Sequence, residues 1–157
     1  MTPLFKKLNY KGQEQVFVLR APEEFEGALE ELATEGPMNV SREIAENSNV
    51  DFAICFAKTL TDIDGIAETV DGRLSSDATV WISYPKKSSK KYTCEFNRDN
   101  GFNAIGAIGL EPVRQVAIDA DWSALRFRKV ENIKTITRRE SFAISKQGKE
   151  RTSQKGK

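Results

Sequence analysis

The fold of this chain is decided by the stretch Val113-Arg114-Gln115-Val116-Ala117-Ile118-Asp119-Ala120-Asp121-Trp122-Ser123-Ala124-Leu125-Arg126-Phe127-Arg128. Two segments in which apolar and polar residues alternate flank a polar turn from Asp119 to Ser123. Alternation with a period of two is typical of a half-buried β-strand, and two such strands around a polar turn predict an antiparallel hairpin. We therefore expect this hairpin to close the sheet of a folded domain.

Upstream of the hairpin, apolar runs predict further strands. The runs at 14–20, 51–58 and 78–84 are almost continuously apolar, and a weaker run at 38–44 suggests a short edge strand. A nearly continuous apolar strand is typical of a parallel sheet, because helices cover both faces of such a sheet. These strands are therefore expected to form its centre.

Helical spacing of apolar residues separates these runs. One helix is predicted just after Pro22, and a second, with an inner face from Ile63 to Leu74, begins near Asp62. A third is expected to have Asn97 as its N-cap and to end by Gly109. Strands that alternate with helices predict an α/β fold, Rossmann-like in plan, with a mostly parallel sheet, helices on both faces and a C-terminal antiparallel hairpin.

The length and the charge distribution predict how the chain is organised. A length of 157 residues suits one domain, expected at 1–128, followed by a basic extension at 129–146 that is partly ordered at most. The polar composition of 147–157 predicts a disordered tail. Residues 129–157 hold 9 basic and 3 acidic residues, a charge of +6, whereas 1–128 hold 15 basic and 20 acidic residues, a charge of −5. This asymmetry is typical of chains with anionic partners.

The residue types that are missing exclude several kinds of chemistry. The chain has no histidine, so histidine-dependent nucleophiles, general bases and zinc sites are excluded. Its two cysteines are far apart, and we expect no metal site and no cofactor. No catalytic residue is assigned. No apolar run reaches the length of a membrane span and no signal-like segment opens the sequence, so a cytoplasmic protein without membrane contact is expected.

A ligand site is expected beyond the carboxyl ends of the strands, where α/β sheets bind ligands. These ends carry cations that would fix an anionic ligand and a tyrosine that would stack on it or donate a hydrogen bond. The start of the third helix adds an arginine at an electropositive terminus. Alternatively, the tyrosine anchors its loop and the cations stay solvated. The ligand-binding candidates are Arg20, Lys58, Tyr84, Lys86 and Arg98.

A lysine-rich loop follows the third long strand. Its lysines alternate with serines and precede a tyrosine, a pattern in which the cations would bind phosphates and the ring would stack on a base. With the basic tail, this loop predicts binding of a nucleic acid or of an acidic protein; the alternative is a solvated loop. The candidates for this basic patch, besides Lys86, are Lys87, Lys90, Lys91 and Tyr92.

Two further groups have competing interpretations. Cys94 is expected to be an unreactive thiol; the alternative is a reactive thiolate, which the cations of the preceding basic loop would favour. Asp119 and Asp121 in the hairpin turn would perform acid–base chemistry or bind a hard cation. In a tight turn, however, such carboxylates more often accept hydrogen bonds from the backbone, with Trp122 covering the edge of the core.

The hairpin belongs to a series of motifs, Tyr84-Pro85-Lys86, Asn97-Arg98-Asp99, Glu111-Pro112-Val113-Arg114-Gln115-Val116-Ala117-Ile118-Asp119 and Asp121-Trp122-Ser123-Ala124-Leu125-Arg126-Phe127-Arg128. Across about residues 12–128, these motifs resemble a bacterial family classed as a domain of unknown function. The resemblance implies a fold and a bacterial cytoplasmic setting, and no activity. The chain departs from the family in its longer lysine–serine loop and its basic extension.

The order of strands and helices is also similar to that of Rossmann-like methyltransferases. Those enzymes have a glycine-rich turn after the first strand, where the backbone approaches the cofactor closely. Here, the turn reads Leu19-Arg20-Ala21-Pro22-Glu23-Glu24 and contains no glycine.

Three functions remain open. A non-catalytic cytoplasmic binding or interaction module is the preferred prediction. The first alternative is a small enzyme or degenerate methyltransferase-like domain that binds an anionic small molecule. The second is electrostatic nucleic-acid binding through the loop 86–91 and the basic tail.

Overall fold

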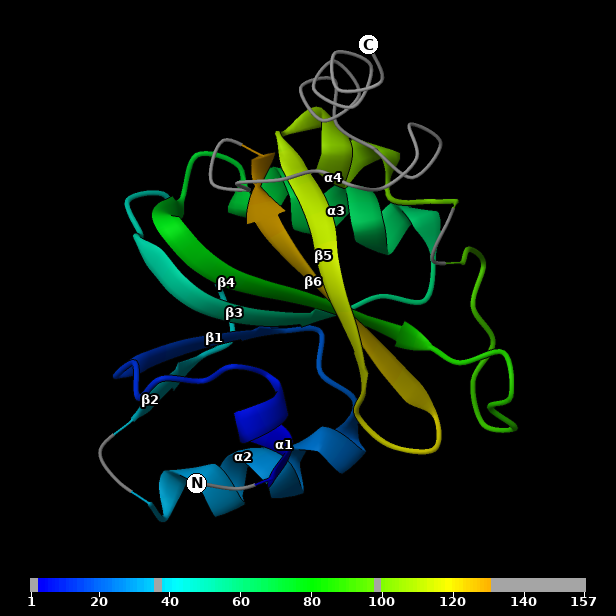
Figure 1. The fold of residues 1–157 in the computed structure, drawn as a ribbon, viewed down its shortest axis with the longest axis horizontal. Helices are drawn as coiled ribbons and strands as arrows, with labels where there is room; N and C mark the ends of the chain where they lie inside the picture. The colour runs from blue at the N-terminus through cyan, green and yellow to red at the C-terminus, as the bar shows by residue number, and fades with distance from the viewer. Residues whose placement is uncertain (1–2, 36–37, 98–99, 131–157) are drawn as a thin grey trace, which may run out of the picture.

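The computed structural model describes residues 3–35, 38–97 and 100–130. Within them, six strands form one sheet in the order β2-β1-β3-β4-β6-β5 (Figure 1). The elements are α1 (Pro3–Lys7), β1 (Gln15–Leu19), the 3-10 helix η1 (Glu23–Phe25), α2 (Glu26–Ala33), β2 (Asn39–Ser41), β3 (Val50–Phe56), α3 (Leu60–Val70), β4 (Leu74–Pro85), α4 (Asn103–Ala107), β5 (Leu110–Ala117) and β6 (Trp122–Lys129).

The sheet confirms the predicted fold class. Strands β1 to β4 are parallel, while β6 lies antiparallel between β4 and β5. The predicted hairpin is the pair β5–β6, in which Ala117 lies opposite Ser123 across the turn. The chain is thus a Rossmann-like α/β sheet that ends in an antiparallel pair.

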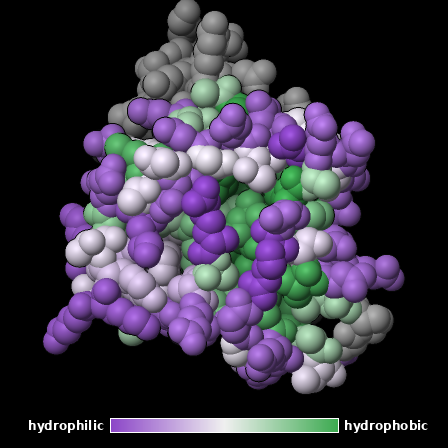
Figure 2. Space-filling view, turned by 180° about the vertical axis from the view of Figure 1, so that it is seen from behind, coloured by the Kyte–Doolittle hydropathy of each residue, from purple (hydrophilic) through white to green (hydrophobic). Residues whose placement is uncertain are grey.

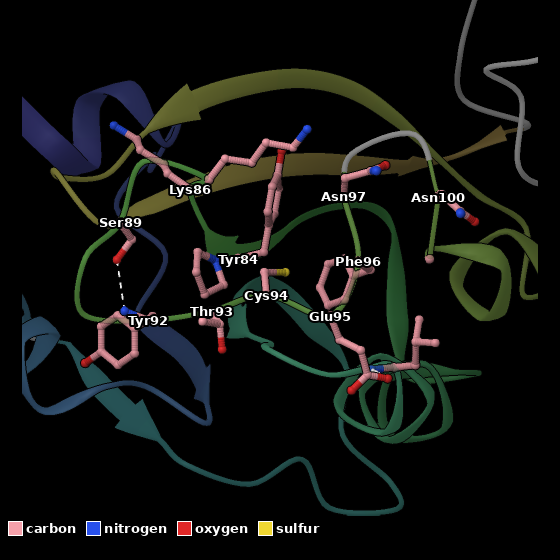
Figure 3. Close-up of a pocket in the computed structure, with 14 residues that line it drawn as sticks. Tyr84, Lys86, Ser89, Tyr92, Thr93, Cys94, Glu95, Phe96, Asn97 and Asn100 are labelled. Atoms are coloured by element: carbon pink, nitrogen blue, oxygen red, sulfur yellow. Dashed lines mark hydrogen bonds between the residues drawn. The ribbon is translucent and has the colours of Figure 1, made fainter.

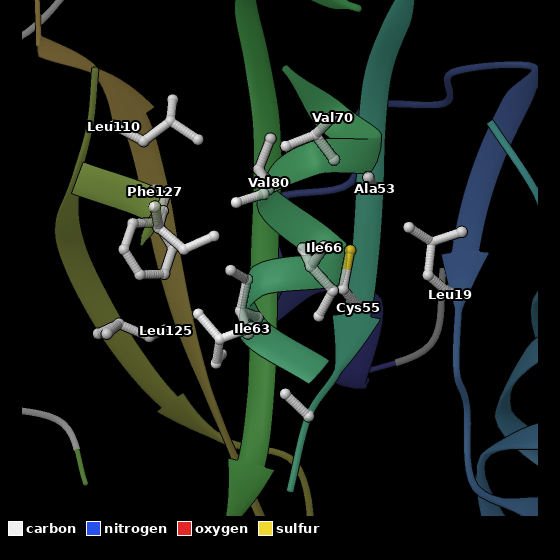
Figure 4. Close-up of a cluster of buried hydrophobic side chains, with 14 of the residues drawn as sticks. Leu19, Ala53, Cys55, Ile63, Ile66, Val70, Val80, Leu110, Leu125 and Phe127 are labelled. Atoms are coloured by element: carbon white, nitrogen blue, oxygen red, sulfur yellow. The ribbon is translucent and has the colours of Figure 1, made fainter. Parts of the chain in front are cut away.

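Two apolar layers, one on each face of the sheet, form the core. Helices α3 and α4 cover one face, and α1, η1 and α2 cover the other (Figure 1). On the first face, Ile63, Ile66 and Val70 of α3 pack against residues of the central strands (Figure 4). On the second face, the fully buried Trp81 donates a hydrogen bond of 2.8 Å from its indole Nε1 to the carbonyl oxygen of Leu8. This bond ties the N-terminal segment to the middle of the sheet.

The structure corrects two details of the predicted helices. Leu74 lies in β4 and not in the preceding helix, because α3 ends at Val70 and the turn at Gly72 has a φ of +74°. Asn97 is not the N-cap of α4, which begins at Asn103 and has only five residues. Instead, the backbones of Asn97 and Asn100 form an isolated antiparallel bridge.

The surface is mainly hydrophilic. In the view from behind, hydrophilic residues surround a central band of hydrophobic ones (Figure 2). Leu60 is the one large hydrophobic residue that is exposed among the described residues. In this part of the chain, no helix has the length and apolar character to span a bilayer.

Candidate functional site

The candidate site lies at the edge of the sheet where β1, β3 and β4 end. After β1 the chain crosses to β2, and after β3 it crosses in the opposite direction to β4, so the strand order reverses between β1 and β3. In open α/β sheets, ligands bind at this topological switch point. Strand β6 begins at the same edge, because Trp122 lies opposite Pro85 at the end of β4. We call this the carboxyl edge.

Arg20 and Asp62 form an ion pair at the switch point. Arg20, directly after β1, has a φ of +61° and donates a hydrogen bond of 3.1 Å from its Nη1 to the Asp62 carboxylate. Asp62 also accepts hydrogen bonds from the backbone N–H groups of Lys58 and Thr59, and it forms a capping box with Thr59 at the start of α3. Burial acts to raise the pKa of Asp62, but these hydrogen bonds and the charge of Arg20 outweigh it and lower the pKa below its usual range.

The absence of a side chain on α3 makes room for Arg20. A Cβ at Gly65 would lie 2.8 Å from Nη2 of Arg20, closer than real side chains approach. The guanidinium therefore lies against the bare backbone of the helix. Arg20 is oriented toward α3 and pairs with Asp62, while half of its side chain stays exposed.

A second set of contacts joins the turn after β1 to the loop after β4. The Glu24 carboxylate accepts hydrogen bonds of 2.7 Å from the Tyr92 hydroxyl and 3.3 Å from the Trp122 indole N–H. Lys91 adds an ion pair at 3.6 Å, and the rings of Tyr92 and Trp122 lie 5.0 Å apart. The hydrogen bond from Tyr92 lowers the pKa of Glu24 and raises that of Tyr92. We call Glu24, Lys91, Tyr92 and Trp122 the Glu24 cluster.

Next to this cluster, the carboxyl edge contains a cavity of about 490 Å³, which we call the edge cavity (Figure 3). Its floor is the end of β4, and its wall is the loop that follows. The loop crosses the strand ends, because the Glu95 N–H donates a hydrogen bond of 2.9 Å to the Lys58 carbonyl at the end of β3. The lining residues are Leu60, Tyr84, Pro85, Lys86, Lys87, Ser89, Tyr92, Thr93, Cys94, Glu95, Phe96, Asn97, Asn100 and Gly101.

Aromatic packing gives the cavity a rigid floor. Tyr84 is almost fully buried, and its ring lies 6.0 Å from that of Phe96 and 5.9 Å from that of Phe102. Gly101 has a φ of +125°, and a Cβ there would collide with Cβ of Phe96. This glycine thus allows the loop to turn back tightly against the aromatic ring.

The charges around the cavity favour an anion. Among the described residues, the ammonium groups of Lys86 and Lys87 form no ion pair. Asn100 adds an exposed amide. The carboxylate of Glu95 lies toward α3 (Figure 3), where it accepts a hydrogen bond of 3.5 Å from the backbone N–H of Leu60.

The structure brings only some of the predicted ligand-binding residues together in one cavity. Tyr84 and Lys86 meet in the edge cavity, whereas Arg20 pairs with Asp62. Lys58 lies outside this cavity, with its ammonium 5.5 Å from the centre of the Tyr92 ring. Arg98 lies outside the described residues.

The residues of the predicted basic patch also lie in different surroundings. Lys87 and Tyr92 line the edge cavity, Lys91 pairs with Glu24, and Lys90 is exposed on the same loop. Tyr92 faces Glu24 with its hydroxyl and Trp122 with its ring, so it is not a free platform for stacking on a base.

The contacts of the hairpin turn confirm its structural interpretation. The Asp119 carboxylate accepts hydrogen bonds of 2.8 Å from the backbone N–H groups of Asp121 and Trp122. Asp121 accepts a hydrogen bond of 2.8 Å from the Ser89 hydroxyl, which connects the turn to the wall of the cavity. No group of three metal-ligating side chains occurs in the part of the chain that the structure describes.

The surroundings of both cysteines disfavour the thiolate, in agreement with the expectation of an unreactive thiol at Cys94. Burial raises the pKa of Cys94, and it raises that of Cys55 to about 12.

We expect iodoacetamide at pH 7 to modify Cys94 slowly and Cys55 not at all, since only the thiolate reacts. The Cys94 rate should still increase above pH 8.5, about the pKa of free cysteine. Mass spectrometry of the native chain measures both rates, with Cys94→Ser as the control; a Cys94 rate at pH 7 equal to that of free cysteine would contradict the expectation.

Sequence reasoning missed the residues that depend on long-range contacts. Glu24 had been assigned only to the start of a helix, and Asp62 only to the beginning of another. Nothing in their local sequence indicates that Tyr92, 68 positions beyond Glu24, donates to its carboxylate.

The comparisons with known proteins support the fold and no family. No protein-family model matches the chain, and no curated protein matches it. The resemblance to a domain of unknown function therefore remains a prediction. One similar solved structure is a SAM-dependent methyltransferase from Aquifex aeolicus. It is 13% identical, the match covers 79% of this chain and 86% of that chain, and the TM-score is 0.51. Another is a ribosomal protein L11 methylase from Lactobacillus delbrueckii subsp. bulgaricus, 11% identical, with 80% of this chain and 76% of that chain covered and a TM-score of 0.47. At 13% identity, the similarity to the Aquifex aeolicus structure shows a Rossmann-like fold and no activity.

Proposed function

We propose that this chain is a binding module with a methyltransferase-like fold, and that it binds a small anionic molecule in the edge cavity. The observation that carries the proposal is the position of this cavity, at the carboxyl edge where α/β sheets bind ligands. Its volume of about 490 Å³ lies within the range of small-molecule sites.

The polar groups of the cavity support an anionic ligand. Lys86, Lys87 and Asn100 line it, so two ammonium groups and an amide are available to a ligand. The aromatic floor at Tyr84 and Phe96 favours a ligand with an apolar or planar part. Together, these features fit an organic acid or phosphate ester of metabolite size.

The residues at the switch point argue against S-adenosylmethionine as the ligand. The turn after β1 has no glycine, and its Glu24 is engaged by Tyr92 and Trp122. Arg20, in the same turn, is bound to Asp62. Because these contacts occupy the polar groups beside the end of β1, we propose ligand binding without methyl transfer.

The experiment is a thermal-stability screen with nucleotides, organic acids, sugar phosphates and S-adenosylmethionine. A molecule that binds only the native chain raises the melting temperature by mass action. We expect at least one anionic compound to do so and S-adenosylmethionine to have no effect. For the compound that binds, Lys86→Gln should raise the dissociation constant about tenfold, the loss of roughly 1.4 kcal/mol.

A matched variant separates the cavity from the charge of its loop. Lys90 lies on the same loop and does not line the cavity, so Lys90→Gln removes the same charge elsewhere. We expect this variant to bind the compound as the unmodified chain does. Equal losses in both variants, or a screen in which no anion stabilises the chain, would refute the proposed site.

A further inference from the structure

Three arginines share one face of the terminal hairpin, away from the edge cavity. Arg126 and Arg128 are two residues apart in β6, and Arg114 of β5 lies directly opposite Arg126. Side chains at such positions point to the same side of a sheet. We call Arg114, Arg126 and Arg128 the arginine face. None of them lines the edge cavity, which lies where β6 begins.

This arrangement is unfavourable without a partner. Like charges directly across a strand pair destabilise it. The Nε atoms of Arg126 and Arg128 are buried, and among the described residues they have no hydrogen-bond partner. A buried donor that forms no hydrogen bond costs free energy. The chain thus places polar groups here that are unsatisfied within its described part.

Within the described ranges, acidic side chains neutralise only one end of the arginine face. Asp77 forms an ion pair of 2.7 Å with Arg128, and the buried Glu111 lies opposite Arg128 in the strand register. The acidic groups thus lie at the Arg128 end of the face. Burial lowers the pKa of Arg126 most, and the charge of Arg128 lowers it further; Asp77 acts in the opposite direction, and Arg114 adds the smallest lowering effect. The open positive end of the face is formed by Arg114 and Arg126.

We infer that the arginine face binds a phosphate group. Guanidinium groups present planar pairs of N–H donors that match phosphate oxygens, and they do so better than ammonium groups. A dianion between Arg114 and Arg126 would relieve their repulsion and accept hydrogen bonds from the outer N–H groups of their guanidiniums. This site is separate from the edge cavity and does not depend on the function proposed for it.

Two kinds of ligand carry a phosphate group that the arginine face would bind in the same way. One is a free phosphate or phosphorylated metabolite, and the other is the backbone of a nucleic acid. The two sources are distinguished by the probes below.

The test compares inorganic phosphate with chloride at equal ionic strength. We expect phosphate to raise the melting temperature of the unmodified chain by several degrees more than chloride does. The double variant Arg114→Gln/Arg126→Gln should lose this difference, and its apparent dissociation constant for phosphate should increase at least about tenfold, or roughly 1.4 kcal/mol. In chloride alone, the variant should melt no lower than the unmodified chain, because a like-charge pair has been removed.

Controls keep the inference falsifiable. Arg114 is exposed, so the single variant Arg114→Gln is expected to fold and to show part of the loss. Lys90→Gln, which removes an exposed charge that belongs to neither site, should leave the phosphate effect unchanged. A phosphate effect that survives in the double variant, or none in the unmodified chain, overturns the inference.

A second probe distinguishes the sources. Fluorescence anisotropy with a single-stranded oligonucleotide of about 12 nucleotides measures binding to a polymer of phosphates. Binding that the double variant loses supports the inference with a nucleic acid as the source. A phosphate effect without oligonucleotide binding supports it with a free phosphate. Oligonucleotide binding that the double variant keeps, together with no phosphate effect, overturns it.

Discussion

Replacing Trp81 with alanine is expected to lower the free energy of unfolding by about 3–5 kcal/mol. The side chain is fully buried against the face that α1 and α2 cover, so truncation leaves a large cavity. Its indole N–H also bonds to the Leu8 carbonyl, which would lose its donor inside the protein. Urea denaturation followed by circular dichroism measures the change.

Trp81→Phe separates the two contributions. It retains most of the apolar volume and removes the donor, so a smaller loss of about 1–3 kcal/mol is expected. The variant should also expose the N-terminal segment, since the hydrogen bond from Trp81 to Leu8 attaches that segment to the sheet. A loss of less than 1 kcal/mol in Trp81→Ala would show that this side of the sheet is not packed as described.

Replacing Trp122 with alanine is expected to lower the free energy of unfolding by about 3–5 kcal/mol and to release the loop that forms the cavity wall. Its ring packs edge-on against Phe56 at 5.2 Å and lies 5.0 Å from Tyr92. Without it, Tyr92 and the Glu24 cluster lose their support. We expect trypsin to cleave at the lysines of 86–91 at least about tenfold faster in the native variant, because proteolysis follows local opening.

Tyr92→Phe is the matched control for this experiment. It removes only the hydroxyl that donates to Glu24 and should cost about 1 kcal/mol. Its cleavage rate should fall between those of the unmodified chain and Trp122→Ala. If trypsin cleaves all three chains equally fast, the loop is not held by the Glu24 cluster.

The parts of the fold that depend on local pattern were predictable from the sequence. Alternating residues on both sides of Asp119 identified the hairpin, and continuous apolar runs identified the parallel strands. Helix α1 was not predicted, because its five residues are too few for a periodic pattern and its buried Phe5 is explained only by packing against the sheet. Asn97 was assigned to a helix because capping residues and turn residues have the same chemistry.

The candidate site was predictable only in part, for a similar reason. The end of a predicted strand identified Tyr84 and Lys86, since the strand ends of an α/β sheet share one edge. Arg20 and Lys58 were placed at the same edge correctly, but their neighbours could not be read from the sequence. The partners Asp62 and Tyr92 are brought to them by α3 and by the loop after β4, and that pairing depends on tertiary structure.

The two outer strands of the sheet have a consequence for how this protein meets other molecules. Strand β2 has only three residues, while β5 contains Pro112 and a register shift next to it. Short or irregular outer strands with proline and charged side chains resist the addition of another chain's strand. We therefore expect the protein to remain free of amyloid-like growth at high concentration and to meet its partners through its loops and faces, without lengthening its sheet.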